Sequence, residues 1–202
     1  MLDLETWGTK PGCAIRSIGA AKFELTGEMG DTFYRNISDD SCSLLDLAFE
    51  SGTVDWWAKR PPEATSAFAD NQESLAAVVG AFHEWINGAL FVWSQGANFD
   101  EPIWRAAAER VNWAPPWKYW NVRDTRTIYH FARFDPRSMK RDGTHHHALN
   151  DALFQIKCVQ ECYRRLHTLP MTTPLAIKEQ PATVIPGHVT FAQPRRYEPR
   201  GW

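Results

Sequence analysis

The chain has 202 residues, 44% of them apolar and 23% charged, which suits one globular domain with a sizeable core, alone or with an appendage. No apolar run approaches the roughly 20 residues of a membrane span, and the N-terminus has no signal-type apolar stretch, so we expect a cytoplasmic protein without a membrane partner. The net charge of -2 excludes a generally basic nucleic-acid-binding chain, so a nucleic-acid partner would need a local basic patch.

The first eight residues read as a strand that carries two acids two residues apart. In an extended strand Asp3 and Glu5 point to one face, while Leu2 and Leu4 point to the other. Two adjacent carboxylates repel each other unless a cation lies between them, and a hard divalent metal ion is the simplest such cation. A solvated pair on an edge strand is the equally weighted alternative.

Alternating patterns predict two more strands, within residues 14–25 and 31–38, so the chain is expected to open with three antiparallel strands joined by turns. Ser41 or Ser43 is expected to cap a helix that passes through Phe49 and ends at Gly52.

Trp56 and Trp57 are adjacent, and basic residues follow them. They cannot both face the core from one side of a helix, so one is expected to be partly exposed and available to stack on bases. The alternative is that both are wedged between a helix and the sheet.

Residues 73–87 form a strongly amphipathic pattern that predicts a helix, and the apolar run Ala89–Ser94 predicts a central strand buried on both faces. Asp100 follows that strand and opens the next predicted helix. Because α/β folds bind ligands at the ends of such strands, Asp100 is a candidate reactive carboxylate. It could equally be a helix cap.

An aromatic, proline-containing loop is predicted for residues 112–120, a short strand for 121–127 and a basic surface loop for 131–141. Arg123 and Arg126 could bind phosphate oxygens or could pair with Asp124 and glutamates in a structural network. Residues 118–142 hold seven Lys or Arg against three acids, whereas residues 1–50 hold nine acids against four Lys or Arg. An acidic pole beside a basic one is what metal-dependent chemistry on a polyanion requires.

A long helix ending near Leu166 follows three consecutive histidines. Asp151 lies in its first turns near the apolar stripe, where an acid needs a partner such as a metal ion. His146 lies in the loop before the helix and has a side chain suited to proton transfer near neutral pH. Cys158 and Cys162 lack a second pair at zinc-finger spacing, so a zinc site is disfavoured and the four cysteines are expected to be reduced packing residues.

The composition changes abruptly after residue 167. Residues 168–202 contain six prolines and show little helical periodicity, so we expect an extended arm that wraps on the core or on a partner, with a disordered tail as the alternative. We therefore divide the chain into a domain at 1–167 and a Pro-rich arm at 168–202. The arm is compatible with a homodimer.

In this order, the four acids and the histidine resemble the DnaQ-like 3′→5′ exonucleases of the DEDDh type, whose motifs are similar to residues 3–8, 98–100 and 146–151. The resemblance is strongest to small phage-type exodeoxyribonucleases, including phage exonuclease A and the exonuclease VIII-like group. These enzymes also show patterns like residues 54–57, 62–64, 96–103 and 120–127. The resemblance covers residues 1 to about 166.

The resemblance implies an α/β, RNase H-like fold with a mixed central sheet flanked by helices. It also implies a metal-dependent 3′→5′ exonuclease that releases nucleoside 5′-monophosphates from single-stranded DNA by a two-metal-ion mechanism. An exoribonuclease of the same fold is the first alternative, and a non-catalytic nucleic-acid-binding protein is the second. A bacterial or phage-infected host cell is the implied setting.

The resemblance also assigns roles to individual residues. Two Mg²⁺ or Mn²⁺ ions, which suit all-oxygen ligands, would be held by Asp3, Glu5, Asp100 and Asp151, and His146 would deprotonate the attacking water. The 3′-terminal nucleotide would contact Thr6, Trp7, Gly8, Asn98 and Phe99, with Trp7 stacked on its base. The strand beyond it would contact Trp56, Trp57, Arg123 and Arg126.

Overall fold

The computed structural model of the chain describes residues 1–143 and 145–168. The predicted Pro-rich arm therefore lies, from residue 169 onward, outside the described residues. Of the helices described, none combines the length and the apolar character that crossing a bilayer requires.

Three consecutive antiparallel strands form the centre of the structure, as the alternating patterns predict. A short fourth strand runs parallel to the third, so the sheet is mixed. The strands lie in chain order across the sheet: β1 (Leu2–Thr6), β2 (Ile15–Phe23), β3 (Met29–Ile37) and β4 (Gln72–Glu73).

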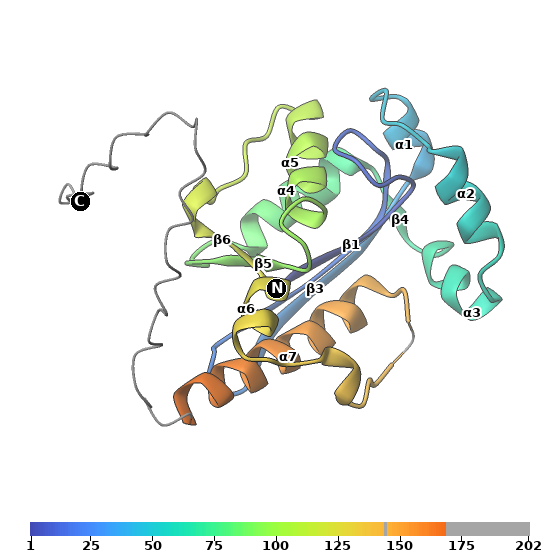
Figure 1. The fold of residues 1–202 in the computed structure, drawn as a ribbon. Helices are drawn as coiled ribbons and strands as arrows, with labels where there is room; N and C mark the ends of the chain where they lie inside the picture. The colour runs from blue at the N-terminus through green and yellow to red at the C-terminus, as the bar shows by residue number, and fades with distance from the viewer. Residues whose placement is uncertain (144, 169–202) are drawn as a thin grey trace, which may run out of the picture. The chain divides into compact units, whose positions relative to one another are not determined.

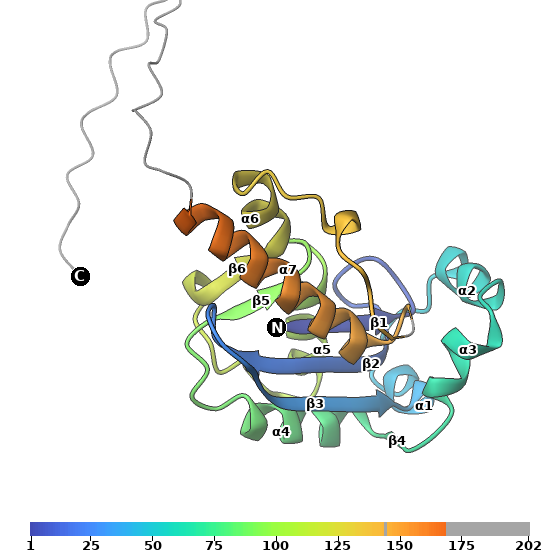
Figure 2. The ribbon, with the colours of Figure 1, turned by 90° about the horizontal axis from the view of Figure 1, so that it is seen from below.

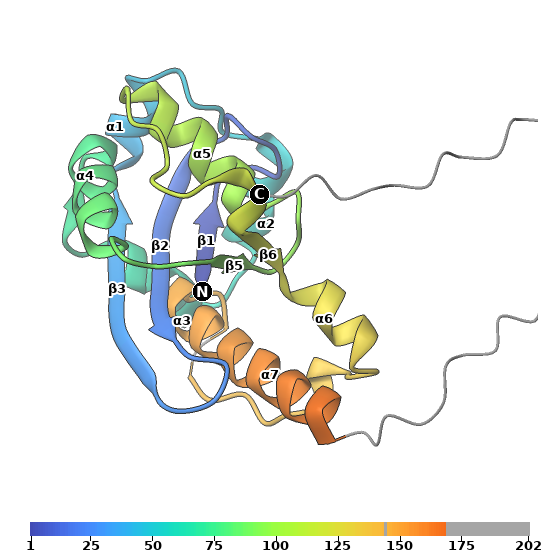
Figure 3. The ribbon, with the colours of Figure 1, turned by 90° about the vertical axis from the view of Figure 1, so that its left-hand side faces the viewer.

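A second sheet of two parallel strands, β5 (Val92–Ser94) and β6 (Val122–Asp124), extends the molecule on the β1 side. Figures 2 and 3 show β5 passing next to β1. Residues that follow β5 and β6, namely Gln95, Asp100 and Arg126, line one pocket together with the end of β1.

Helices cover both faces of the main sheet (Figure 1), which confirms the mixed α/β architecture. One apolar core joins the sheet to α4 and α5, and a second joins it to α6 and α7. Figure 2 shows α4 and α7 on opposite sides of the strands. The helices are α1 (Asp39–Ser43), α2 (Ser51–Ala58), α3 (Pro62–Thr65), α4 (Leu75–Trp85), α5 (Asp100–Arg110), α6 (Thr125–Phe131) and α7 (Ala148–Thr168).

The alternation of β1 decides which residues face which core. Leu2 and Leu4 enter the core beneath α4 and α5, so Asp3 and Glu5 face the side that α7 covers. In the ladder Asp3 pairs with Gly19 and Glu5 with Ser17 of β2. The small partner residues leave room above the two acids.

The helix predicted to run from Ser41 or Ser43 to Gly52 is wrong in its bounds. Ser38 caps α1, which ends at Ser43, and Asp46 follows with a φ of 54°, which does not continue a right-handed helix. Ala48 forms a parallel bridge with Cys13, which holds this segment extended before α2 begins. Gly52 is therefore inside a helix and not at the end of one.

Two other expectations need correction. The strand predicted from Ala89 begins only at Val92, because Leu90 and Phe91 are exposed and not buried on both faces. The strand predicted over residues 121–127 ends at Asp124, whose side chain accepts hydrogen bonds from the Arg126 and Thr127 amides and so starts α6.

Candidate active site

The acids singled out in the sequence converge on one pocket. The pocket has a volume of about 700 Å³ and lies at the carboxyl end of β1. All four acids and His146 are among its lining residues. Asp3, Glu5 and Asp100 are buried, and Asp151 is half-buried. Side chains separated by almost the whole domain in sequence therefore form one cluster.

Asp100 is tied directly to the strand that carries the first two acids. It lies in the first turn of α5, and its Oδ1 accepts a hydrogen bond of 3.0 Å from the Leu4 amide. The alternative that Asp100 caps the helix does not hold, because Phe99 occupies the N-cap position. Asp100 is instead a buried carboxylate that locks α5 onto β1.

Asp151 reaches the cluster because α7 lies against β2 without an intervening side chain. A Cβ atom added to Gly19 would overlap the backbone of Ala148 and Leu149. Only glycine permits this approach, and the first turn of α7 is thereby brought over the strand that neighbours β1. Asp151 lies in that first turn.

Gln155 adds a second link between α7 and β1. It lies one helical turn after Asp151, and its Nε2 donates a hydrogen bond of 2.6 Å to Oδ1 of Asp3. The bond is buried. Sequence analysis missed Gln155, although its spacing of four residues from Asp151 on a predicted helix would have placed both on one face.

The cluster is electrostatically unfavourable on its own. Burial raises the pKa of Asp3 well above its usual range, and the three neighbouring carboxylates raise it further. Burial, followed by the charges of Asp151 and Asp100, raises the pKa of Glu5 to about 8. Burial raises the pKa of Asp100 to about 7. Carboxylates in this arrangement are stabilised in their charged form only by nearby cations.

The donor set fits a hard divalent cation. Glu5, His146 and Asp151 each offer one ligand atom, and these three atoms lie within 4.8 Å of one another. With Asp3 and Asp100 beside them, carboxylate oxygens dominate, which is the chemistry that Mg²⁺ and Mn²⁺ prefer. The residues of this pocket can therefore hold such ions.

His146 is placed by an uncommon backbone conformation and by two aromatic rings. Its φ is 61°, and its ring meets the Trp56 and Trp57 rings edge-on, with centroids 4.9 and 6.0 Å away. Burial lowers the pKa of His146 below its usual value, although the charge of Asp151 opposes this effect. A neutral imidazole beside the carboxylates can accept a proton.

Comparison with known proteins shows the family to which the chain belongs. Residues 1–163 match the model of the 3'-5' exoribonuclease Rv2179c-like domain. The chain belongs to this exonuclease family. It is also similar to the "Exodeoxyribonuclease" of Enterobacteria phage T4, with 26% identity over 155 residues, covering 63% of this chain and 68% of the phage protein. The resemblance to 3′→5′ exonucleases noted in the sequence is confirmed at the level of an exonuclease family.

Most of the residues expected to contact substrate in this exonuclease domain do border the pocket. Of the tryptophan pair, Trp57 is 4% and Trp56 37% exposed, so one is partly exposed as expected. The Trp57 indole N–H donates to the Thr6 carbonyl oxygen over 2.9 Å and so joins α2 to the end of β1. The predicted residues that line the pocket are Thr6, Gly8, Trp56, Trp57, Phe99 and Arg126.

Trp7, which is expected to stack on a terminal base, is outside the pocket lining. Its indole N–H donates to Asp39 over 2.6 Å, and the Arg16 guanidinium lies 4.1 Å from its ring centroid. Arg16 also lies 4.5 Å from the Trp57 ring centroid. Trp7 is therefore part of the packing that supports the pocket wall.

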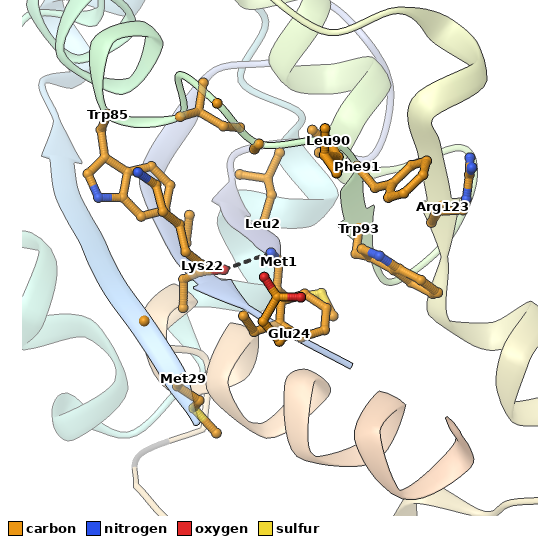
Figure 4. A pocket seen from close by; sticks show the side chains of 18 of the residues that line it. Met1, Leu2, Lys22, Glu24, Met29, Trp85, Leu90, Phe91, Trp93 and Arg123 are labelled. Atoms are coloured by element: carbon orange, nitrogen blue, oxygen red, sulfur yellow. Dashed lines mark hydrogen bonds between the residues drawn. The ribbon is translucent and has the colours of Figure 1, made fainter. Parts of the chain in front are cut away.

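Asn98 and Arg123 also lie outside the pocket lining. Arg123 donates to the Trp120 and Val122 carbonyl oxygens and lies over the Phe91 ring. It borders a different cavity of about 680 Å³ at the opposite end of β1, between the β2–β3 loop and residues 85–93. Figure 4 shows Phe91, Trp93 and Arg123 along one side of that cavity, away from Trp85.

Other pocket residues had no signal in the sequence. Glu50 and Gln95 line the pocket from loops, and Glu50 accepts a hydrogen bond from the Thr9 hydroxyl. Arg141, which is outside the pocket lining, forms an ion pair with Asp151 of the pocket from the basic loop before the histidines. Loop residues follow no periodic pattern, so their proximity to the pocket can be recognised only once the path of the loop is known.

Proposed function

We propose that this exonuclease is a DEDDh-type enzyme with an RNase H-like fold that removes nucleoside 5′-monophosphates from the 3′ end of single-stranded nucleic acid. The observation that carries the proposal is the convergence of Asp3, Glu5, Asp100, Asp151 and His146 on one pocket. A non-catalytic binding protein would have no need for four carboxylates that destabilise one another.

Asp3, Glu5, Asp100 and Asp151 would hold two divalent cations, Mg²⁺ or Mn²⁺. When bound, such ions neutralise charge on the phosphate and the leaving oxygen and activate the attacking water. Burial of the acids keeps bulk water from screening these charges. The hydrogen bond from Gln155 orients Asp3, and the bond from Leu4 orients Asp100.

His146 would act as the general base. Its lowered pKa leaves the imidazole neutral near pH 7, so it can take a proton from water. The edges of Trp56 and Trp57 restrict where the ring can turn. The terminal nucleotide would lie among Thr6, Gly8 and Phe99, with Arg126 available to a phosphate oxygen.

DNA and RNA are both candidate substrates. The sequence resemblance favours DNA, and the similar phage protein carries an exodeoxyribonuclease name. The family model that matches residues 1–163 is described as an exoribonuclease domain. We therefore propose a single-stranded substrate and leave the choice of sugar to a direct comparison of the two.

The test uses 5′-labelled DNA and RNA oligonucleotides of one sequence, with Mg²⁺, with Mn²⁺ and with EDTA. Stepwise shortening from the 3′ end and release of mononucleotides are expected only with metal. Asp151→Asn should abolish shortening, whereas Asp135→Asn, at an exposed acid paired with Arg137, should not. Binding without shortening would favour the non-catalytic alternative, and retained activity in Asp151→Asn would refute the assignment.

Two further parts of the proposal have their own measurements. Calorimetry of the metal-free protein should give two Mn²⁺ sites per chain if two ions are held. Light scattering of the full chain tests whether it is a homodimer.

A further inference from the structure

Arg141 brings a positive charge to Asp151, one of the proposed metal ligands. Its guanidinium forms an ion pair with Asp151, and the two side chains are only 23% and 15% exposed. The guanidinium carbon also lies 4.7 Å from the centroid of Phe154, one turn further along α7. A half-buried guanidinium that contacts both a carboxylate and an aromatic ring is held more strongly than one in a surface ion pair.

The loop that carries Arg141 is fastened to α7. The next residue, Asp142, forms an ion pair of 2.9 Å with Lys157. Arg141 is therefore held close to the pocket whether or not its own ion pair forms. Its Nε is buried and has no hydrogen-bond partner within residues 1–143 and 145–168, so part of its donor fork is unused.

Asp151 cannot serve Arg141 and a divalent cation equally well. Two cations on one carboxylate repel each other, and the effect is strong where water is largely excluded. A guanidinium released from Asp151 would find a phosphate group as its natural partner, because its planar fork matches two phosphate oxygens.

We propose that Arg141 is the resident counter-cation of the carboxylate cluster and exchanges partners during use. It pairs with Asp151 in the metal-free enzyme, leaves Asp151 when a divalent cation binds, and then binds a phosphate of the nucleic acid. The first exchange, in which a divalent cation displaces Arg141 from Asp151, depends only on metal binding. The second exchange, in which Arg141 binds a phosphate of the nucleic acid, rests on the proposed function.

Arg165 provides a matched control. It also pairs with a carboxylate, that of Glu161 at 2.7 Å, and it also lies over a phenylalanine, 4.8 Å from the Phe134 centroid. It belongs to the same helix as Asp151 but lies far along it from the pocket. Arg165→Gln therefore removes the same charge and the same two contacts away from the site.

The first exchange is tested without any nuclease assay. In the wild-type protein, the arginine Nε–H NMR signal that is lost in Arg141→Gln should shift when Mg²⁺ is added, and the Arg165 signal should not. Arg141→Gln should bind Mn²⁺ about fivefold more tightly by calorimetry, because a competing ion pair is lost. Arg165→Gln should match the wild type. An unmoved Arg141 signal, or equal affinity in both variants, would overturn the proposal.

The second exchange is tested by steady-state kinetics on an oligonucleotide at saturating metal. Arg141→Gln should raise KM about tenfold or more with a smaller change in kcat, since a charge-assisted phosphate contact is lost. The KM of Arg141→Lys should lie between those of the wild type and Arg141→Gln, because lysine keeps the positive charge but lacks the planar guanidinium fork. An unchanged KM in Arg141→Gln would refute phosphate binding. If the wild type binds metal but shortens no oligonucleotide, the proposed function fails while the first exchange stays testable.

Discussion

Gln155 donates a hydrogen bond to Asp3 across 152 residues of sequence, and this bond joins the last described helix to the first strand. The donor is neutral, so it orients the carboxylate without supplying the charge that a metal ion would supply. It also lowers the pKa of Asp3 against the larger effect of burial. Gln155 therefore fixes one oxygen of Asp3 and leaves the other for the pocket.

Replacing Gln155 by methionine should reduce catalysis more than stability. The substitution keeps a similar volume but removes the donor, so Asp3 is no longer oriented. Loss of such a supporting hydrogen bond typically costs about 10- to 100-fold in metal affinity or activity. The measurements are kcat/KM and Mn²⁺ affinity. Gln160→Met, further along the same helix where the side chain donates to the Glu24 carbonyl oxygen, should change neither.

Gly19 should be the glycine least tolerant of substitution. Gly19→Ala forces α7 away from β2, and we expect a loss of about 3 kcal/mol or more in the free energy of unfolding, as for severe overpacking. Gly80→Ala is the control, since the new methyl group would meet only Trp113 Cζ2 at 4.0 Å. A glycine inside a helix costs about 0.5–1 kcal/mol relative to alanine, so Gly80→Ala should be stabilising. Urea denaturation of both variants and the wild type measures these changes in the free energy of unfolding.

The stability of the metal-free protein should fall as the pH rises from about 5 to 8. Glu5 and Asp100 have pKa values raised to about 8 and about 7, so the folded state holds protons that the unfolded chain has already lost. Stability must then decrease with pH across that window. In EDTA the Tm should drop by about 5 °C or more, and saturating Mg²⁺ should restore most of it.

The variant Glu5→Gln checks the origin of this pH dependence. It removes one titrating group, so its Tm in EDTA should vary less with pH than that of the wild type. A profile identical to the wild type would show that the slope arises elsewhere in the chain.

The four cysteines should be unreactive in the native protein. All are buried, and burial raises the pKa of the Cys13, Cys158 and Cys162 thiols to about 11. The reactive thiolate is therefore scarce near neutral pH. Iodoacetamide at pH 8 should label none of the four by mass spectrometry until denaturant is added. Rapid labelling of the folded protein would contradict the burial.

Sequence reasoning succeeded where one local rule decides the outcome. Strand alternation placed Asp3 and Glu5 on one face, and helical periodicity located α4 and α7. Periodic patterns of that length have few alternative structures. The convergence of Asp100 and Asp151 on the strand followed from the family resemblance and not from spacing.

Reasoning failed where a distant partner decides the local structure. Ala48 leaves the predicted helix because it bridges to Cys13. The contacts of the Trp7 ring with Asp39 and Arg16 could not be read from the sequence either. The close approach at Gly19 depends on which helix crosses β2. These contacts are tertiary, and no window of neighbouring residues contains them.

The docking of α7 on Gly19 also bears on when activity can begin. A nascent chain that has not yet exposed this helix lacks Asp151 and Gln155, so the proposed catalytic centre is incomplete while the polypeptide is still emerging among messenger and ribosomal RNA. The proposed nuclease activity would then appear only after α7 has docked on the sheet. Because Asp3 and Gln155 come from opposite ends of the domain, the proposed activity would require the whole domain to be folded.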